Sequence, residues 1–139
     1  VERDYTDEAR LILMTLESMG SDGLSQTKLA QVVAGTLKFQ WRKSGVEARL
    51  YQTIQVCKAA KEKLSEQQGR PRWTADYVRE LASLLASRGY LRTQTRNFSA
   101  KAGRERNVTY NVYLIGQRGS EALRRQSKIM LPIPDYIRN

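Results

Sequence analysis

The spacing of apolar residues changes once along this chain, and that change limits the fold more than any other feature. Up to Gly89, apolar side chains recur three and four residues apart, as they do on one face of a helix. Beyond it they follow a strand pattern, and over 108–115 Val, Tyr, Val and Leu alternate with a second set of residues. The fold must therefore combine a helical part with a β-hairpin close to its C-terminal end.

The helical part divides into four segments with recognisable ends. Their limits are set by Ser or Thr caps and by glycines that stop a helix. The segments expected are one from Thr6 to the loop at 20–23, one from Ser25 to Gly35, one over 46–64, and the best-marked one from Thr74 to Gly89. Residues 36–43 show no clear period and are predicted as a loop or a helical turn. Residues 66–72 contain glycine and proline and are predicted as a loop.

The hairpin is expected to have strands at 90–97 and 108–115, with a polar tip at 98–106 that contains Gly103. A turn at 116–119 then leads into a short helix at 120–126. Pro132 and Pro134 require an extended tail, because each proline disfavours helix in the residue before it. This predicts one domain at 1–130, followed by an extended C-terminal tail at 131–139.

This order of elements predicts a mainly α fold with a β-hairpin wing. It is the order of a winged helix, a member of the helix-turn-helix superfamily in which a three-helix core precedes a two-stranded wing.

The chain is strongly basic, and its charge is unevenly distributed. It has 24 Lys and Arg residues against 14 Asp and Glu residues, a net charge of +10 and a pI near 10.0. Residues 1–25 hold six acids and two bases, a net charge of −4, so residues 26–139 carry +14. Such a balance suits a polyanionic partner such as nucleic acid.

Several chemistries are excluded by composition. The chain has no histidine and a single cysteine, Cys57, so neither a Cys/His zinc site nor a Ser-His-Asp arrangement can be assembled. It has no phosphate-binding glycine motif of a nucleotide hydrolase, although carboxylate or lysine chemistry stays open. Cys57 lies in a helical apolar pattern and is expected to be a small buried hydrophobe, and a lone cysteine fits a reducing compartment. No apolar run approaches the ~20 residues of a membrane span, so no membrane partner is expected.

Residues 77–91, which end in Gly-Tyr-Leu, and residues 113–123, which contain Leu-Ile-Gly-Gln-Arg-Gly, together resemble the winged-helix (RQC) domain of RecQ-family DNA helicases. Residues 5–10 and 33–38 are similar to its first helix and to its glycine turn. The family's four-cysteine zinc module and its ATPase motor are absent from this sequence. The resemblance implies a non-catalytic module without a cofactor of its own, whose parent helicase would use ATP, Mg²⁺ and a structural zinc outside it.

The same resemblance implies a place in DNA repair, recombination or replication. The expected partners are DNA forks, duplex ends and branched structures, together with the motor domains of the parent helicase. It implies a nuclear protein, with a bacterial cytoplasm as the alternative.

The hairpin carries the first candidate site. Five bases, Arg92, Arg96, Lys101, Arg104 and Arg106, surround one acid, and Asn97 and Phe98 begin the tip. Bases neutralise phosphates, and an aromatic ring can stack on an exposed nucleobase. In the family that the chain resembles, this hairpin is a strand-separating wedge, which would make Phe98 the wedge residue. Alternatively, Phe98 folds back onto the core or pairs with Tyr110 across the hairpin.

The second candidate site is the glycine turn at 35–38. A glycine and a hydroxyl at the start of a helix would leave amide groups free to hold a phosphate. Thr36 and Lys38 are the residues expected there, with Lys28 and Arg42 extending the patch and Arg72 meeting the backbone from just before the fourth helix.

Two other functions fit the same fold. A sequence-specific regulator would read the major groove with the helix after Thr74, whose expected outward residues are Arg79, Glu80, Ser83, Ser87 and Arg88. A protein-interaction winged helix would instead use its acidic first helix as a docking face.

Overall fold

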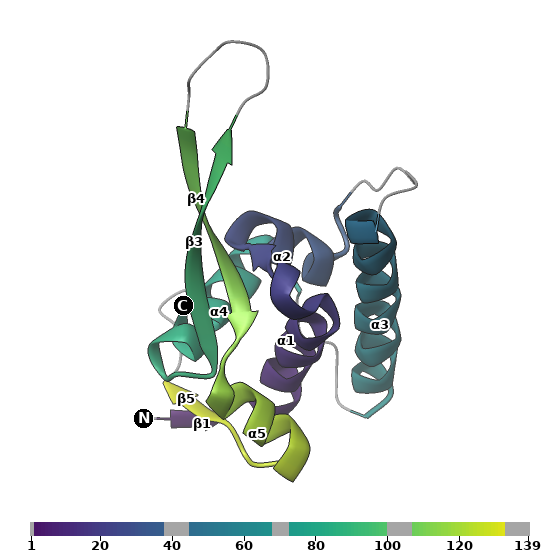
Figure 1. The fold of residues 1–139 in the computed structure, drawn as a ribbon. Coiled ribbons are helices and arrows are strands. Elements are labelled where there is room, and N and C mark those ends of the chain that lie inside the picture. The colour runs from purple at the N-terminus through teal and green to yellow at the C-terminus, as the bar shows by residue number, and fades with distance from the viewer. Residues whose placement is uncertain (1, 38–44, 68–72, 100–106, 133–139) are drawn as a thin grey trace.

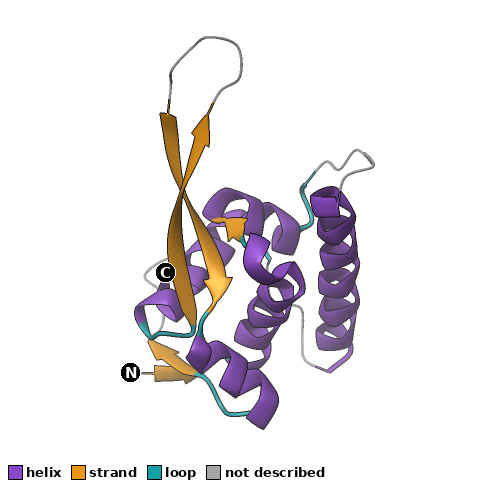
Figure 2. Ribbon diagram, viewed as in Figure 1, coloured by secondary structure: helices purple, strands orange, loops and turns teal. Residues whose placement is uncertain are grey.

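The computed structural model describes residues 2–37, 45–67, 73–99 and 107–132 of the chain. This part is mainly helical and contains two small antiparallel sheets (Figures 1 and 2). In chain order the elements are β1 (Glu2–Asp4), α1 (Thr6–Met19), the 3-10 turn η1 (Gly20–Asp22), β2 (Leu24–Ser25), α2 (Gln26–Ala34), α3 (Gly45–Gln67), α4 (Ala75–Ser87), β3 (Leu91–Ser99), β4 (Asn107–Ile115), α5 (Gln117–Arg125) and β5 (Met130–Pro132).

The four predicted helices are all present, and two of the predicted caps are confirmed. The Ser25 side chain accepts a hydrogen bond from the Lys28 amide, and the Thr74 side chain accepts one from the Tyr77 amide. Helix α3 extends beyond the predicted range of 46–64 at both ends and has 23 residues, whereas α4 has 13.

The start of α1 is tied to the end of the described chain. The Asp4 carboxylate accepts a hydrogen bond from the Thr6 amide at 2.9 Å, and the Thr6 hydroxyl accepts one from the Ile129 amide at 2.9 Å. Strands β1 and β5 pair beside this junction, with Arg3 opposite Leu131. Leu131 is fully buried, so β5 crosses the expected boundary at residue 130. The predicted extended tail holds for Leu131 and Pro132, and its remainder lies outside the described residues.

The hairpin is longer than predicted and is joined by a third strand. Strand β3 continues to Ser99, because the ladder with β4 runs on through Phe98 opposite Val108 and Ser99 opposite Asn107. The alternative in which Phe98 pairs directly with Tyr110 is wrong, since Tyr110 lies opposite Arg96. The two-residue strand β2 pairs with β4, which makes the sheet order β2-β4-β3. Two residues are too few to show an alternating pattern in a sequence.

Helix α5 begins at Gln117, three residues before the predicted start at Ser120. Gly119 was expected in a turn but lies inside the helix. A Cβ atom at this position would lie 2.3 Å from the Tyr90 carbonyl oxygen and 2.8 Å from a Leu13 methyl group. The glycine is therefore required by the close approach of α5 to the start of the hairpin.

One hydrophobic core unites these elements. Its fully buried side chains come mainly from α1, α2 and α4, and Ile129 and Leu131 complete it from the C-terminal side. Among the described helices, none is both long enough and apolar enough to cross a membrane.

Candidate nucleic-acid interface

The hairpin of β3 and β4 extends away from the helices (Figure 1). Each strand has nine residues, which at about 3.3 Å per residue gives an arm roughly 30 Å long. Strand β2 supports it only at Val112 and Tyr113. Beyond this point the two strands have no other strand beside them in the described chain.

The inner end of the hairpin is tightly joined to the helices. The Gly116 amide donates to the Tyr90 carbonyl oxygen at 2.9 Å. The Arg118 guanidinium of α5 lies 4.5 Å from the centre of the Tyr90 ring and donates to the Arg88 carbonyl oxygen at 2.7 Å. These contacts give the arm a firm base.

The Arg96 guanidinium links the outer part of the hairpin to the turn after α1. It donates to the Asp22 carbonyl oxygen at 2.6 Å and to the Ser21 carbonyl oxygen. Two further hydrogen bonds, of 3.2 and 3.0 Å, reach the Gln94 side-chain oxygen. These four bonds use all but one of the five guanidinium N–H groups. Arg96, which we expected among the phosphate contacts, is occupied by the chain's own oxygens.

The remaining surface of the hairpin is polar and largely exposed. The Thr95 hydroxyl and the Asn111 side-chain oxygen lie 2.8 Å apart across the two strands. Arg92 is exposed, and no described residue forms a hydrogen bond or an ion pair with it. Arg92 is therefore free to meet a phosphate from solution.

A groove of about 560 Å³ lies under the arm, between β4, η1 and the start of α2. It contains Tyr110, which is 41% exposed, and the exposed Lys28 of the first turn of α2. Its lining residues are Met19, Asp22, Gly23, Leu24, Ser25, Lys28, Leu50, Arg96, Tyr110 and Val112.

The charges in this groove are partly paired. Asp22 forms a salt bridge of 3.1 Å with Arg49, which offsets its negative charge. Lys28 and the exposed Tyr110 ring line the same groove, a combination that can hold a phosphate and stack on a base. Sequence reasoning named Lys28 only as an extension of another patch and treated Tyr110 as part of an apolar stripe. Its phenol group, in a stripe otherwise made of Val and Leu, was the available signal.

The glycine turn after α2 does not offer free amide groups. Gly35 has φ 79° and ends the helix, its amide donates to the Val32 carbonyl oxygen at 3.3 Å, and the Thr36 amide donates to Gln31 at 2.9 Å. The Lys61 ammonium also reaches this end and donates to the Val33 carbonyl oxygen at 2.7 Å. Gly35 and Thr36 belong to a helix C-terminus rather than to a helix start, so their amides do not form the expected phosphate site. The Thr36 side chain is exposed.

Much of the predicted site lies outside the described residues. This holds for Lys38, Arg42, Arg72, Lys101, Arg104 and Arg106. Asn97 and Phe98 are described by their backbone only, as members of β3.

The predicted outward face of α4 is exposed at Arg79, Glu80, Ser83, Ser87 and Arg88. The Arg79 guanidinium lies 3.3 Å from the Asp76 carboxylate, and the Ser87 hydroxyl donates to the Leu84 carbonyl oxygen at 2.7 Å. Two of the five side chains are thus engaged within their own helix.

Cys57 is buried, as predicted, with 2% of its surface exposed. Burial raises the pKa of its thiol above the ordinary value, which disfavours the reactive thiolate. Among the described residues, no group of three His, Cys, Asp or Glu side chains is placed to hold a metal ion.

Comparison of this chain with models of protein families, with curated protein sequences and with solved structures returned no match. The class of protein is therefore inferred from the fold and from the hairpin site.

Proposed function

We propose that this chain is a winged-helix module that binds nucleic acid and serves a RecQ-like DNA helicase at forks and duplex ends. The observation that carries the proposal is the hairpin, an arm of two nine-residue strands that extends beyond the helices (Figure 1) and exposes polar side chains together with the basic Arg92.

The topology supports the winged-helix assignment. Helix α2 packs against α4, and the hairpin follows α4 directly. The short strand β2, placed between α1 and α2, joins the second strand of the hairpin in the sheet. A core of α1, α2 and α4 followed by a two-stranded wing, with such a strand beside it, is compatible with a winged helix in which α3 is an added element.

The chemistry of the arm suits a duplex end better than the middle of a duplex. Arg92 and Lys28 can neutralise phosphates, and Arg96 holds the arm at a set angle to the turn after α1. Stacking of an aromatic ring on an unpaired base is worth about 1–3 kcal/mol, and opening one base-pair step costs about 1.4 kcal/mol. One ring, from Phe98 or Tyr110, can therefore offset one opened pair.

Reading of the major groove by α4 is less favoured. Arg79 is paired with Asp76 and Ser87 is bonded to its own helix, which leaves few side chains for base edges. Selection from random duplexes should accordingly return no sharp sequence motif.

The proposal is tested by comparing a linear duplex with a closed circle of the same sequence. Fluorescence anisotropy should show tighter binding to the linear form and to a forked duplex than to the circle. Phe98→Ala should remove most of the preference for ends, about 10-fold in affinity. Equal affinity for the linear duplex and the circle would contradict the proposal.

Charge controls separate this site from general attraction between a basic chain and DNA. Arg92→Gln should weaken binding. Lys58→Gln should weaken it less, because Lys58 is exposed on α3, a helix that lies across the helical body from the hairpin (Figure 1). Equal losses for the two variants would show that net charge alone is responsible.

A further inference from the structure

We infer that the groove between α1 and α3 is a docking site for a helix of a partner protein that carries an apolar stripe and acidic flanks. This inference does not rest on the proposed function, because α3 lies on the opposite side of the helical body from the hairpin (Figure 1).

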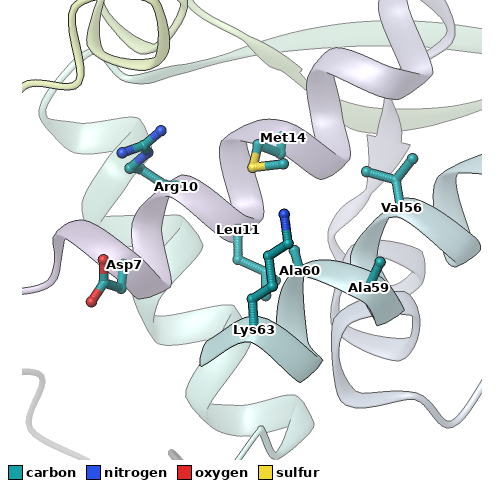
Figure 3. A pocket seen from close by; sticks show the side chains of 8 residues that line it. All are labelled: Asp7, Arg10, Leu11, Met14, Val56, Ala59, Ala60 and Lys63. Atoms are coloured by element: carbon teal, nitrogen blue, oxygen red, sulfur yellow. The ribbon is translucent and has the colours of Figure 1, made fainter. Parts of the chain in front are cut away.

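The groove has a volume of about 490 Å³ and is formed by two helices only. Helix α1 contributes one wall and α3 the other (Figure 3). Its lining residues are Asp7, Arg10, Leu11 and Met14 from α1, and Val56, Ala59, Ala60 and Lys63 from α3.

Both walls have the same helical spacing. In each helix the lining residues stand at positions i, i+3, i+4 and i+7, so each wall is a straight stripe about two turns long. The helices run antiparallel, because Ser18 near the end of α1 contacts Thr53 near the start of α3. A valley between two aligned helices is the surface on which a third helix packs.

The end of the groove at Met14 and Val56 is apolar and open. Met14 is 37% exposed and Val56 is 38% exposed, and they are two of the five large hydrophobic side chains that the described chain exposes. Leu11 is buried beneath them, and Ala59 and Ala60 add little bulk. An incoming helix can therefore approach closely and cover both exposed side chains.

The other end of the groove is mainly cationic. Arg10 and Lys63 line it with one acid, Asp7, and none of these three side chains forms a hydrogen bond or ion pair with another described residue. Two unpaired cations beside an apolar floor favour acidic residues next to the apolar stripe of the occupant. This charge complementarity favours a foreign acidic helix over a second copy of this basic chain.

The probe is a fluorescein-labelled helical peptide of about 16 residues, with leucines three and four positions apart and glutamates beside them. Binding to the whole 139-residue chain is measured by anisotropy, and we expect a dissociation constant of roughly 10–100 µM, as for a small interface. Met14→Glu should weaken binding at least 10-fold. Met130→Glu is the matched control, since Met130 is similarly exposed, at 40%, but lies on β5.

The preference for acidic residues is tested at the cationic end of the groove. Lys63→Glu should weaken binding, whereas Lys58→Glu, on the same helix but outside the groove, should leave it nearly unchanged. A peptide with lysines in place of glutamates should bind the wild type less tightly and the Lys63→Glu variant more tightly. Thermal melting of each variant confirms that it is folded.

Three results would overturn the inference. The first is no binding of the acidic peptide at 1 mM, and the second is equal affinity for Met14→Glu and Met130→Glu. The third is self-association of the chain that Met14→Glu abolishes, because a second copy would then be the occupant.

Discussion

The inner and outer parts of the hairpin are built from the same two strands but are held in different ways. The inner part, around Leu91 and Leu114, is buried and lies against α5, where Gly116 and Gly119 allow backbone to meet backbone. The outer part is exposed, and the Arg96 guanidinium bonds it to the turn after α1. Packing at the base and the Arg96 hydrogen bonds together position the arm, and of the two described hairpin bases only Arg92, opposite Leu114 at the inner end, stays free to bind.

The largest expected effect tests the packed base. Gly119→Ala should lower the free energy of unfolding by about 3 kcal/mol, because the new methyl group would lie 2.3 Å from the Tyr90 carbonyl oxygen. In an open helix the same change would stabilise by about 1 kcal/mol, so the sign of the effect is decisive. Urea denaturation measures it.

Gly89→Ala is the matched control for that experiment. Gly89 has φ 83° and nothing within 4 Å of an added Cβ, so alanine should cost only the left-handed backbone strain of about 1–2 kcal/mol. An equal loss for both glycines would show that α5 can move away from the hairpin.

The next largest effect tests the link that the Arg96 guanidinium makes between the outer part of the hairpin and the turn after α1. Arg96→Ala should lower the free energy of unfolding by about 1–2 kcal/mol, because the hydrogen bonds to the Ser21 and Asp22 carbonyl oxygens are lost. It should also weaken binding to a forked duplex, since the arm loses its set angle. Amide exchange of 93–99 should become faster in the variant, and unchanged exchange would argue against Arg96 as the link.

A smaller effect is expected at Arg92, which is exposed and makes no contact that stability depends on. Arg92→Gln should change the free energy of unfolding by less than about 0.5 kcal/mol and reduce the salt slope of DNA binding by about 0.9. Titrations at several salt concentrations provide the slope. A stability loss as large as that of Arg96→Ala would show that the two arginines share one structural role.

The smallest expected effect concerns the stability contribution of Glu8, which lies in α1 and not in the hairpin. Burial raises the pKa of the Glu8 carboxyl, so at neutral pH its charge opposes folding. Glu8→Gln should raise Tm by about 1–2 °C at pH 7. The gain should shrink as the pH falls through the raised folded-state pKa and vanish below the unfolded value of about 4.3, because both states are then protonated. A gain that is independent of pH would contradict this origin.

Local patterns predicted the four helices, two caps and the hairpin, because caps, glycines and apolar spacing act within a few residues. They failed at one local turn and where distant segments meet. The glycine turn after α2 was taken as a phosphate site, yet its amides complete the helix they follow. The extra length of β3 and the strand β2 were missed, because a ladder is extended by its partner strand.

The amino-acid sequence alone predicts that this chain is basic beyond residue 25, mainly helical, and has a hairpin after its fourth helix, because these properties depend on composition and on local spacing. Only the tertiary structure decided which bases are free. Arg92 and Arg96 cannot be told apart from the sequence. In the structure Arg92 is exposed, whereas the Arg96 guanidinium is hydrogen-bonded to a turn more than 70 residues earlier in the chain. It likewise placed the two aligned stripes of α1 and α3 side by side, since only packing brings such distant residues together.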